Sequence, residues 1–241
     1  MQSYKNFKQY LNEAGGETGW KIEIANTSLE DARAYAIPLF EKFGRDLYEE
    51  IPNFDENYLF AQKKAKQGKL NRKDMPVVPD EMEDVKKLQR HLENGLIDIR
   101  KPKAKPVKGK DPFPQGLSGK KAEEWLTNGL KDGKHPDDKI KVTKEKIKVQ
   151  DLKILQKQIY FDKSISSIAQ FGAKGTKDFM KTTFFIISKD GFVLDGNHRF
   201  LSTMLLDPNF KVTGIVIDLP MKQLHPLLLS YSDAQGNARN I

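Results

Sequence analysis

The feature that most constrains the fold is residues 195–203 (DGNHRFLST), together with the two apolar runs that precede them. The runs at 184–187 and 192–194 are rich in β-forming residues and flank a Lys-Asp-Gly turn, so they predict a β-hairpin. After the second run the spacing of apolar residues becomes helical. The residues of that helical face are Phe200, Leu201, Met204 and Leu205. The segment therefore predicts a strand, a tight turn and a helix.

A turn of this kind can bind a phosphate. The first backbone N–H groups of a helix and the positive end of its dipole attract an anion. Gly196 allows the backbone to come close to a phosphate, and Arg199 can donate to two of its oxygens. His198 is a titratable donor or base, while Asp195 can hold a divalent cation, orient His198 or cap the helix. The alternative is a purely structural turn, in which His198 and Arg199 only meet solvent.

Composition narrows the function classes. The 241-residue chain has 38% hydrophobic and 31% charged residues, which predicts a soluble protein. It contains no cysteine, which excludes disulfides, thiolate catalysis and thiolate-bound zinc. No apolar stretch approaches the roughly 20 residues needed to cross a bilayer, so no membrane partner is predicted. The net charge of +8 is compatible with an anionic partner such as a nucleotide or a nucleic acid.

The predicted fold class is α+β, with a helical N-terminal region followed by a compact α+β domain. Sequence patterns predict helices at 1–14, 28–43, 56–67, 80–94, 118–130 and 199–206, and strands at 20–24, 147–149 and 212–219. The predicted domains are a mainly helical region at 1–100, a basic linker rich in lysine and proline at 101–117, and the α+β domain at 118–241. The lysines at 101–110 (KPKAKPVKGK) belong either to a flexible connector or to a strap for nucleic-acid phosphates.

The C-terminal pattern resembles the ParB/sulfiredoxin superfamily over about residues 141–219. The shared features are an opening strand that leads to a Leu-x-x-x-Gln element at 152–156, the hairpin, the His-Arg pair that begins a helix, and a closing strand at 212–219. The most specific piece is Asp-Gly-Asn-His-Arg at 195–199, which is similar to the Asp-Gly-His-His-Arg form of the family motif. The resemblance implies a ParB/sulfiredoxin-like domain within 118–241.

The chemistry of this family varies, so the fold does not settle the activity. Sulfiredoxins carry a catalytic Cys directly before the His-Arg pair, where this chain has Asn197, and that activity is excluded. Free-serine kinases of the superfamily use an acid near the end of the first element. This chain has Gln156 and Lys157 there, which puts small-molecule kinase activity in doubt. Other members, in phages and mobile elements, are called nucleases or nucleotide-dependent DNA-processing enzymes.

The resemblance implies a nucleotide site at the turn, with ATP or CTP as the ligand and Mg²⁺ as the metal. In the family, the connection before the hairpin lies near the nucleotide, which implies that a lysine from the basic loop around Gly172 reaches a phosphate. A solvated loop is the alternative. The implied phosphate-binding residues are Gly196, Asn197, His198, Arg199, Lys177 and Lys181. The implied catalytic residues are His198, Asp195 and Arg199, and Asp195 is the implied metal ligand.

Residues 1–13 (MQSYKNFKQYLNE) resemble the N-terminal peptides of proteins made by large contractile-tailed phages. Some of those peptides are cut in the prohead after Leu-x-Glu, which matches the Leu-Asn-Glu sequence before Ala14. An ordinary amphipathic docking helix is the alternative. The resemblance implies a phage protein that resides in the host cytoplasm or in the virion interior.

The sequence thus predicts a phage ParB/sulfiredoxin-like enzyme that binds a nucleotide or DNA phosphates. The predicted chemistry is metal-assisted phosphoryl transfer or hydrolysis of a phosphodiester or nucleoside triphosphate, as in a nuclease, an NTPase or a kinase. Two alternatives stay open. One is a non-catalytic nucleotide- or DNA-binding module that meets host or phage proteins through its N-terminal helices. The other is a packaged virion-internal protein.

Overall fold

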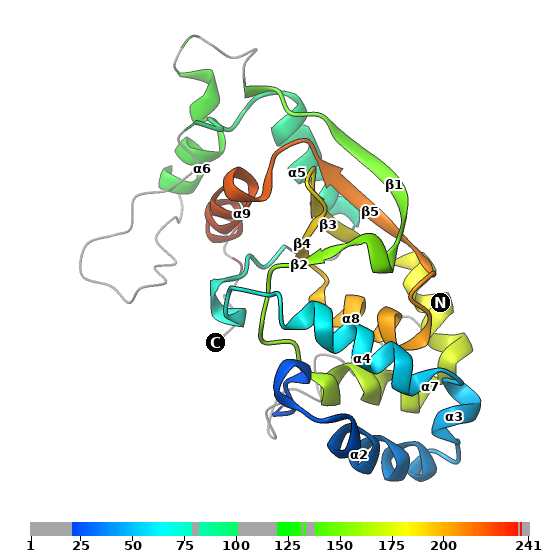
Figure 1. The fold of residues 1–241 in the computed structure, drawn as a ribbon. Coiled ribbons are helices and arrows are strands. Elements are labelled where there is room, and N and C mark those ends of the chain that lie inside the picture. The colour runs from blue at the N-terminus through cyan, green and yellow to red at the C-terminus, as the bar shows by residue number, and fades with distance from the viewer. Residues whose placement is uncertain are drawn as a thin grey trace. The chain divides into compact units, whose positions relative to one another are not determined.

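The computed structural model describes residues 21–78, 82–100, 120–131, 133, 138–235 and 237. The predicted helix at 1–14 and the basic linker at 101–117 lie outside these residues. The fold is α+β, as predicted (Figure 1). Its helices are α2 (Leu29–Lys42), α3 (Leu47–Glu50), α4 (Phe54–Ala65), α5 (Met82–Glu93), α6 (Lys120–Leu126), α7 (Phe161–Thr182), α8 (Asn197–Leu206) and α9 (Met221–Ala234). Its strands are β1 (Val142–Lys148), β2 (Lys153–Ile154), β3 (Phe185–Ser188), β4 (Phe192–Asp195) and β5 (Lys211–Ile217).

The strands form a mixed sheet in the order β1-β5-β3-β4-β2. β3 pairs antiparallel with β4, and the pairing of Ile187 with Val193 confirms the predicted hairpin. β3 also pairs in parallel with β5, from Phe185 opposite Gly214 to Ser188 opposite Ile217. All four residues of β3 are buried, as expected for a central strand. β4, the second strand of the hairpin, therefore leads directly into α8.

Packing divides the described chain into two compact units, each built from separate stretches of sequence. One unit, which we name the helical unit, contains residues 21–70, 146–184 and 196–213. The other, which we name the sheet unit, contains the described residues of 71–145, 185–195 and 214–241. The linear division predicted at the basic linker stays a prediction, because the linker lies outside the described residues.

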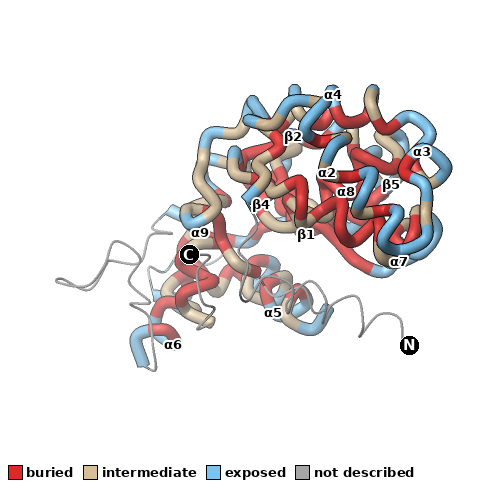
Figure 2. The backbone as a smooth tube through the Cα atoms, turned by 90° about the horizontal axis from the view of Figure 1, so that it is seen from below, coloured by how far each residue is buried: buried red, intermediate tan, exposed pale blue. Residues whose placement is uncertain are grey.

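The core of the helical unit is formed where α2, α4, α7 and α8 face one another (Figure 2). Large aromatic side chains fill it, and Phe40, Phe54, Tyr58, Phe161 and Phe200 are almost fully buried. The rings of Tyr58 and Phe161 meet edge to face with centroids 5.3 Å apart, a favourable aromatic geometry. This packing holds α7 and α8 together, and both helices contribute to the predicted turn region.

In the sheet unit, β3, the middle of β4 and most of the end of β5 are buried, and so are the apolar faces of α5 and α9. On α5 the predicted stripe is confirmed, because Val85, Leu88 and Leu92 are all buried. On α9 the buried residues include Leu224, Leu227 and Leu228. Helix α9 had not been predicted. Its apolar spacing is interrupted by His225 and Pro226, which weakens the helical signal.

Two predictions of local structure are wrong. The predicted strand at 20–24 is replaced by a 3₁₀ helix at Ile24–Asn26, and Glu23 makes only an isolated bridge to Tyr160. The chain turns here because the Glu23 carbonyl accepts hydrogen bonds from the Asn26 N–H and the Thr27 hydroxyl.

The second error is the predicted basic loop around Gly172, which is the second half of α7. Gly172 has φ 72° and ψ 167°, so the helix breaks at one residue and begins again at Ala173. The carboxylate of Glu50 accepts the Ala173 N–H at 2.5 Å, which caps the new start. A cap supplied by a residue so distant in sequence leaves no local signal.

Candidate functional site

The predicted turn is formed by Gly196, which lies between β4 and α8 and caps the N-terminus of α8. Its φ of 99° and ψ of 18° are left-handed, a conformation that favours glycine. The carbonyl of Gly196 accepts the Phe200 N–H at 2.8 Å and so begins the helix. The first N–H groups of the ten-residue helix have no acceptor within the helix, which gives this end a partial positive charge.

His198 is held firmly by its neighbours in the helical unit. Its ring stacks on the Tyr160 ring, with centroids 5.9 Å apart and an interplanar angle of 11°. Its Nε2 accepts the Tyr160 backbone N–H at 3.3 Å, and its carbonyl accepts the hydroxyls of Ser164 and Ser202 at 3.2 and 3.1 Å. A neutral histidine whose Nε2 accepts carries its proton on Nδ1. In this arrangement the imidazole presents a donor rather than a base.

Arg199 is oriented by a buried hydroxyl. Its Nη1 donates to Thr183 Oγ1 at 2.8 Å, and Thr183 is only 6% exposed. Arg199 and Lys163 line one small pocket, together with Ser164 and His198. The pocket has a volume of about 20 Å³, which is room for about one water molecule and not for a nucleobase. Two cationic residues thus line one pocket beside the first turn of α8.

Asn197 is buried in the first turn, with 6% of its surface exposed. Its Oδ1 is buried and has no hydrogen-bond partner among the residues that the structure describes. Buried polar atoms of this kind are rare in folded proteins. The side chain therefore has unused hydrogen-bonding capacity at the place where the sequence predicts a ligand.

Asp195 ends β4 and is half-buried, opposite Ile186 in the hairpin. Within the described ranges, no group of three or more His, Cys, Asp or Glu side chains is close enough to hold a metal ion. The assignment of Asp195 as a Mg²⁺ ligand stays a prediction. A single carboxylate can still hold Mg²⁺ when substrate phosphates and water supply the other ligands.

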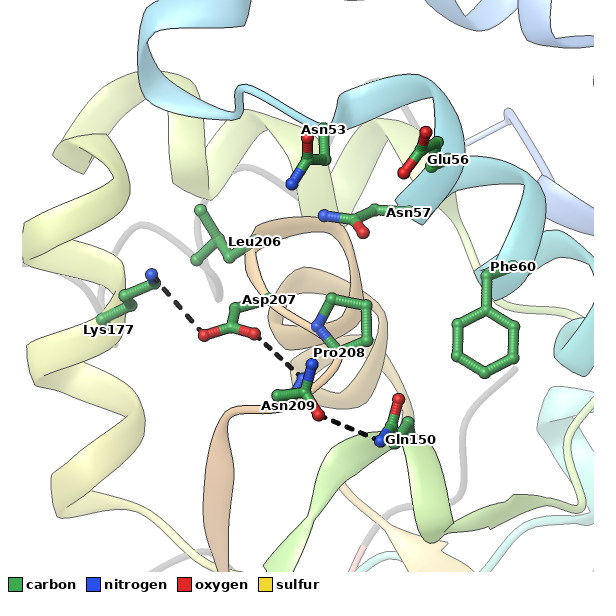
Figure 3. Close-up of a pocket in the computed structure, with 10 residues that line it drawn as sticks. All are labelled: Asn53, Glu56, Asn57, Phe60, Gln150, Lys177, Leu206, Asp207, Pro208 and Asn209. Atoms are coloured by element: carbon green, nitrogen blue, oxygen red, sulfur yellow. Dashed lines mark hydrogen bonds and ion pairs between the residues drawn. The ribbon is translucent and has the colours of Figure 1, made fainter.

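The two predicted lysines lie on the second half of α7. Lys181, near the end of α7, forms an exposed ion pair with Asp178 at 2.7 Å. Lys177 lies 3.9 Å from Asp207, the residue that ends α8, and lines a second, larger pocket (Figure 3). Ten helical residues span about 15 Å, so Lys177 meets α8 at the end opposite His198. The structure thus joins Gly196, Asn197, His198 and Arg199 and places Lys177 at the other end of α8, while the role of Lys181 stays a prediction.

Sequence reasoning missed the partners that fix the turn. Tyr160, Lys163, Ser164 and Thr183 come from α7 and its flanks, and α7 had not been predicted. A signal was present in the apolar residues Ile165, Ile168 and Ala169, which have helical spacing and are buried. Gly172 and Gly175, a few residues later, obscured it by suggesting a loop.

Comparisons of the chain with protein-family models, with characterised proteins and with solved structures find no match. In the described part of the chain, every helix is too short or too polar to span a membrane. The functional conclusion therefore rests on the geometry of the turn and of the side chains around it.

Proposed function

We propose that this protein binds a phosphate-bearing ligand, a nucleotide or a nucleic acid, at the N-terminus of α8. The observation that carries the proposal is that Lys163 and Arg199 both line one pocket at the first turn of a ten-residue helix. The helix terminus and the two cations each favour an anion there. Because the pocket is too small for a base, the phosphate lies at its mouth and the remainder of the ligand lies outside it.

Each residue of the turn has a role in this proposal. Gly196 lets the phosphate approach the backbone without meeting a Cβ. Asn197 donates to the phosphate through its amide N–H₂ group. A half-turn of the amide puts this group in the place of the Oδ1, which has no hydrogen-bond partner among the described residues. Arg199, already oriented by Thr183, donates to phosphate oxygens. The resemblance to the ParB/sulfiredoxin superfamily, with its phosphate-binding Asp-Gly-x-His-Arg turn, supports the same assignment.

The orientation of His198 favours a binding module over a catalyst. Its Nε2 already accepts a backbone N–H, so the neutral ring is a donor to phosphate through Nδ1. Action as a general base would require the ring to break this contact or change tautomer. Metal-assisted phosphoryl transfer or hydrolysis, with Asp195 holding Mg²⁺, remains the catalytic form of the proposal, and turnover assays separate the two forms.

The test is thermal unfolding with ATP, CTP, GTP, ADP or a short single-stranded DNA, each with and without Mg²⁺. A ligand at a hundredfold excess over its Kd stabilises the native state by about 2.7 kcal/mol, which raises the Tm. We expect Arg199→Gln and Lys163→Ala to abolish this shift. Lys177→Ala is the matched control, because it removes a lysine of the same helix that lies at the opposite end of α8 and does not line this pocket. Equal shifts in all variants, or none with any ligand, would contradict the proposal.

A further inference from the structure

A second pocket in the helical unit has a volume of about 440 Å³, which is within the range of small-molecule sites. One wall is the first half of α4, and the opposite wall is the loop that joins α8 to β5 (Figure 3). The pocket lies at the C-terminal end of α8, about 15 Å from the turn that begins the helix. It is therefore separate from the proposed phosphate site.

Asn57 gives this pocket a fixed polar group. Its side chain is more than nine-tenths buried, with 8% exposed. Its Nδ2 donates to the Leu205 carbonyl at 2.8 Å, which fixes the plane of the amide. The Oδ1 is thereby turned toward the space between α4 and the loop (Figure 3). An oriented acceptor of this kind favours a ligand that donates hydrogen bonds.

The loop wall is held in place by its own polar contacts. Asp207 accepts the Asn209 backbone N–H at 2.9 Å and lies 3.9 Å from the Lys177 ammonium. Gln150 Nε2 donates to Asn209 Oδ1 at 3.1 Å. The opposite ends of these two amides, Gln150 Oε1 and Asn209 Nδ2, are an acceptor and a donor at the edge of the same pocket. The wall thus presents both kinds of hydrogen-bonding group.

The charges of the pocket disfavour an anion. Glu56 and Asp207 contribute two negative charges against one positive charge on Lys177, a net charge of −1. Amides outnumber charged groups, and amides suit ligand groups that both donate and accept, as hydroxyls do. Phe60, with 37% of its surface exposed, adds an aromatic face on which an apolar C–H surface can pack.

We propose that this pocket binds an uncharged, hydroxyl-rich small molecule with the chemistry of a mono- or disaccharide. Asn57 and Asn209 hydrogen-bond its hydroxyls, and Phe60 packs against its C–H face. The proposal does not depend on phosphate binding at the other end of α8, because it shares no residue with that site.

The test is saturation-transfer NMR on the full chain with glucose, N-acetylglucosamine and maltose, and with adenosine and spermidine as ligands of other classes. We expect at least one saccharide to bind saturably with a Kd near or below about 1 mM. Phe60→Ala and Asn209→Ala should each weaken that binding by about tenfold, while the Tm stays close to that of the parent protein. Phe60 is 37% exposed, and the Gln150–Asn209 hydrogen bond that Asn209→Ala removes is exposed to solvent.

Leu59→Ala is the matched control. Leu59 neighbours Phe60 on α4 and is 50% exposed, and it does not line the pocket. Saccharide binding should be unchanged in this variant and in Arg199→Gln, which separates this result from the phosphate proposal. Failure of every saccharide to saturate below about 10 mM would overturn the inference. Binding of adenosine or spermidine without any saccharide, or equal affinities in Phe60→Ala and Leu59→Ala, would overturn it as well.

Discussion

His198 has two structural contacts that limit its chemistry, the Tyr160 N–H on its Nε2 and the stacked Tyr160 ring. The amide oxygen of glutamine can replace Nε2 as the acceptor without being titratable. We expect His198→Gln to keep the Tm and any phosphate-induced shift, whereas His198→Ala loses about 1–3 kcal/mol because a partly buried N–H loses its acceptor. Thermal unfolding measures the Tm and its shift, and urea unfolding measures the loss of free energy. If His198→Gln folds and binds normally but loses a measured turnover, the residue is catalytic and the binding-only form is wrong.

At the scale of single residues, the sequence located the turn but not its surroundings. Gly196 and the helix after it are local features, because a left-handed glycine and a change of apolar period leave their signal within a few residues. Tyr160 and Lys163 precede His198 by 38 and 35 positions, and nothing near the turn indicates that they return to it. Only tertiary packing shows that the imidazole is a structural acceptor.

At the scale of elements, substitution of Gly172 tests whether the break in α7 requires a glycine. A Cβ on Gly172 would lie 2.7 Å from Arg45 Nη1 and 3.2 Å from Glu50 Oε1, and its φ of 72° with ψ of 167° suits only glycine. Gly172→Ala should lose about 1–3 kcal/mol of unfolding free energy. Gly175→Ala is the control, since its Cβ would make an ordinary 3.4 Å contact with Phe171 in a helix that favours alanine.

Urea unfolding should therefore show a lower free energy of unfolding for Gly172→Ala than for the parent protein. For Gly175→Ala the free energy of unfolding should equal or exceed that of the parent. A Gly172→Ala protein as stable as Gly175→Ala would mean that neither the left-handed φ of Gly172 nor crowding by the Arg45–Glu50 ion pair, whose Nη1–Oε1 distance is 2.6 Å, makes a side chain costly at this position. The predicted helices with local caps and clean stripes, such as α2 with Ser28 at its N-cap, were confirmed. Helix α7 was missed because its cap at Ala173 comes from Glu50, 123 positions earlier.

At the scale of the whole molecule, long-range contacts decide the architecture. The Asn57–Leu205 hydrogen bond joins positions 148 apart, and each unit gathers separate stretches of chain. Pattern and composition predicted the α+β class because periodicity and turn chemistry are local. They contain no information on which helix packs against which, so the interleaved units could not be predicted from them.

The sheet unit carries a group that links its stability to pH. His91 on α5 is half-buried, with its Nδ1 3.3 Å from the Tyr231 hydroxyl on α9. Burial, followed by the nearby charges of Lys87 and Arg90, holds the pKa of His91 below its ordinary value of 6.5. The unfolded chain then binds more protons than the folded protein between the two pKa values, so stability falls as the pH drops through this window. The stability that depends on neutral His91 is fully present above about pH 6.5 and is lost as the pH falls through the lowered pKa.

Hydrogen exchange at about pH 7.5 and about pH 5.5 tests this linkage, once rates are corrected for the intrinsic effect of pH. We expect peptides from α5 and α9 to lose protection on acidification more than peptides from α2 and α4, which belong to the helical unit. His91→Gln keeps a partner for Tyr231 and cannot titrate, so the extra loss should disappear in this variant. His225→Gln is the control, a second histidine of the sheet unit that bonds the Asp74 carbonyl. If the extra loss persists in His91→Gln, or disappears in His225→Gln, protonation of His91 is not the cause, and the acid response belongs to other groups of the sheet unit.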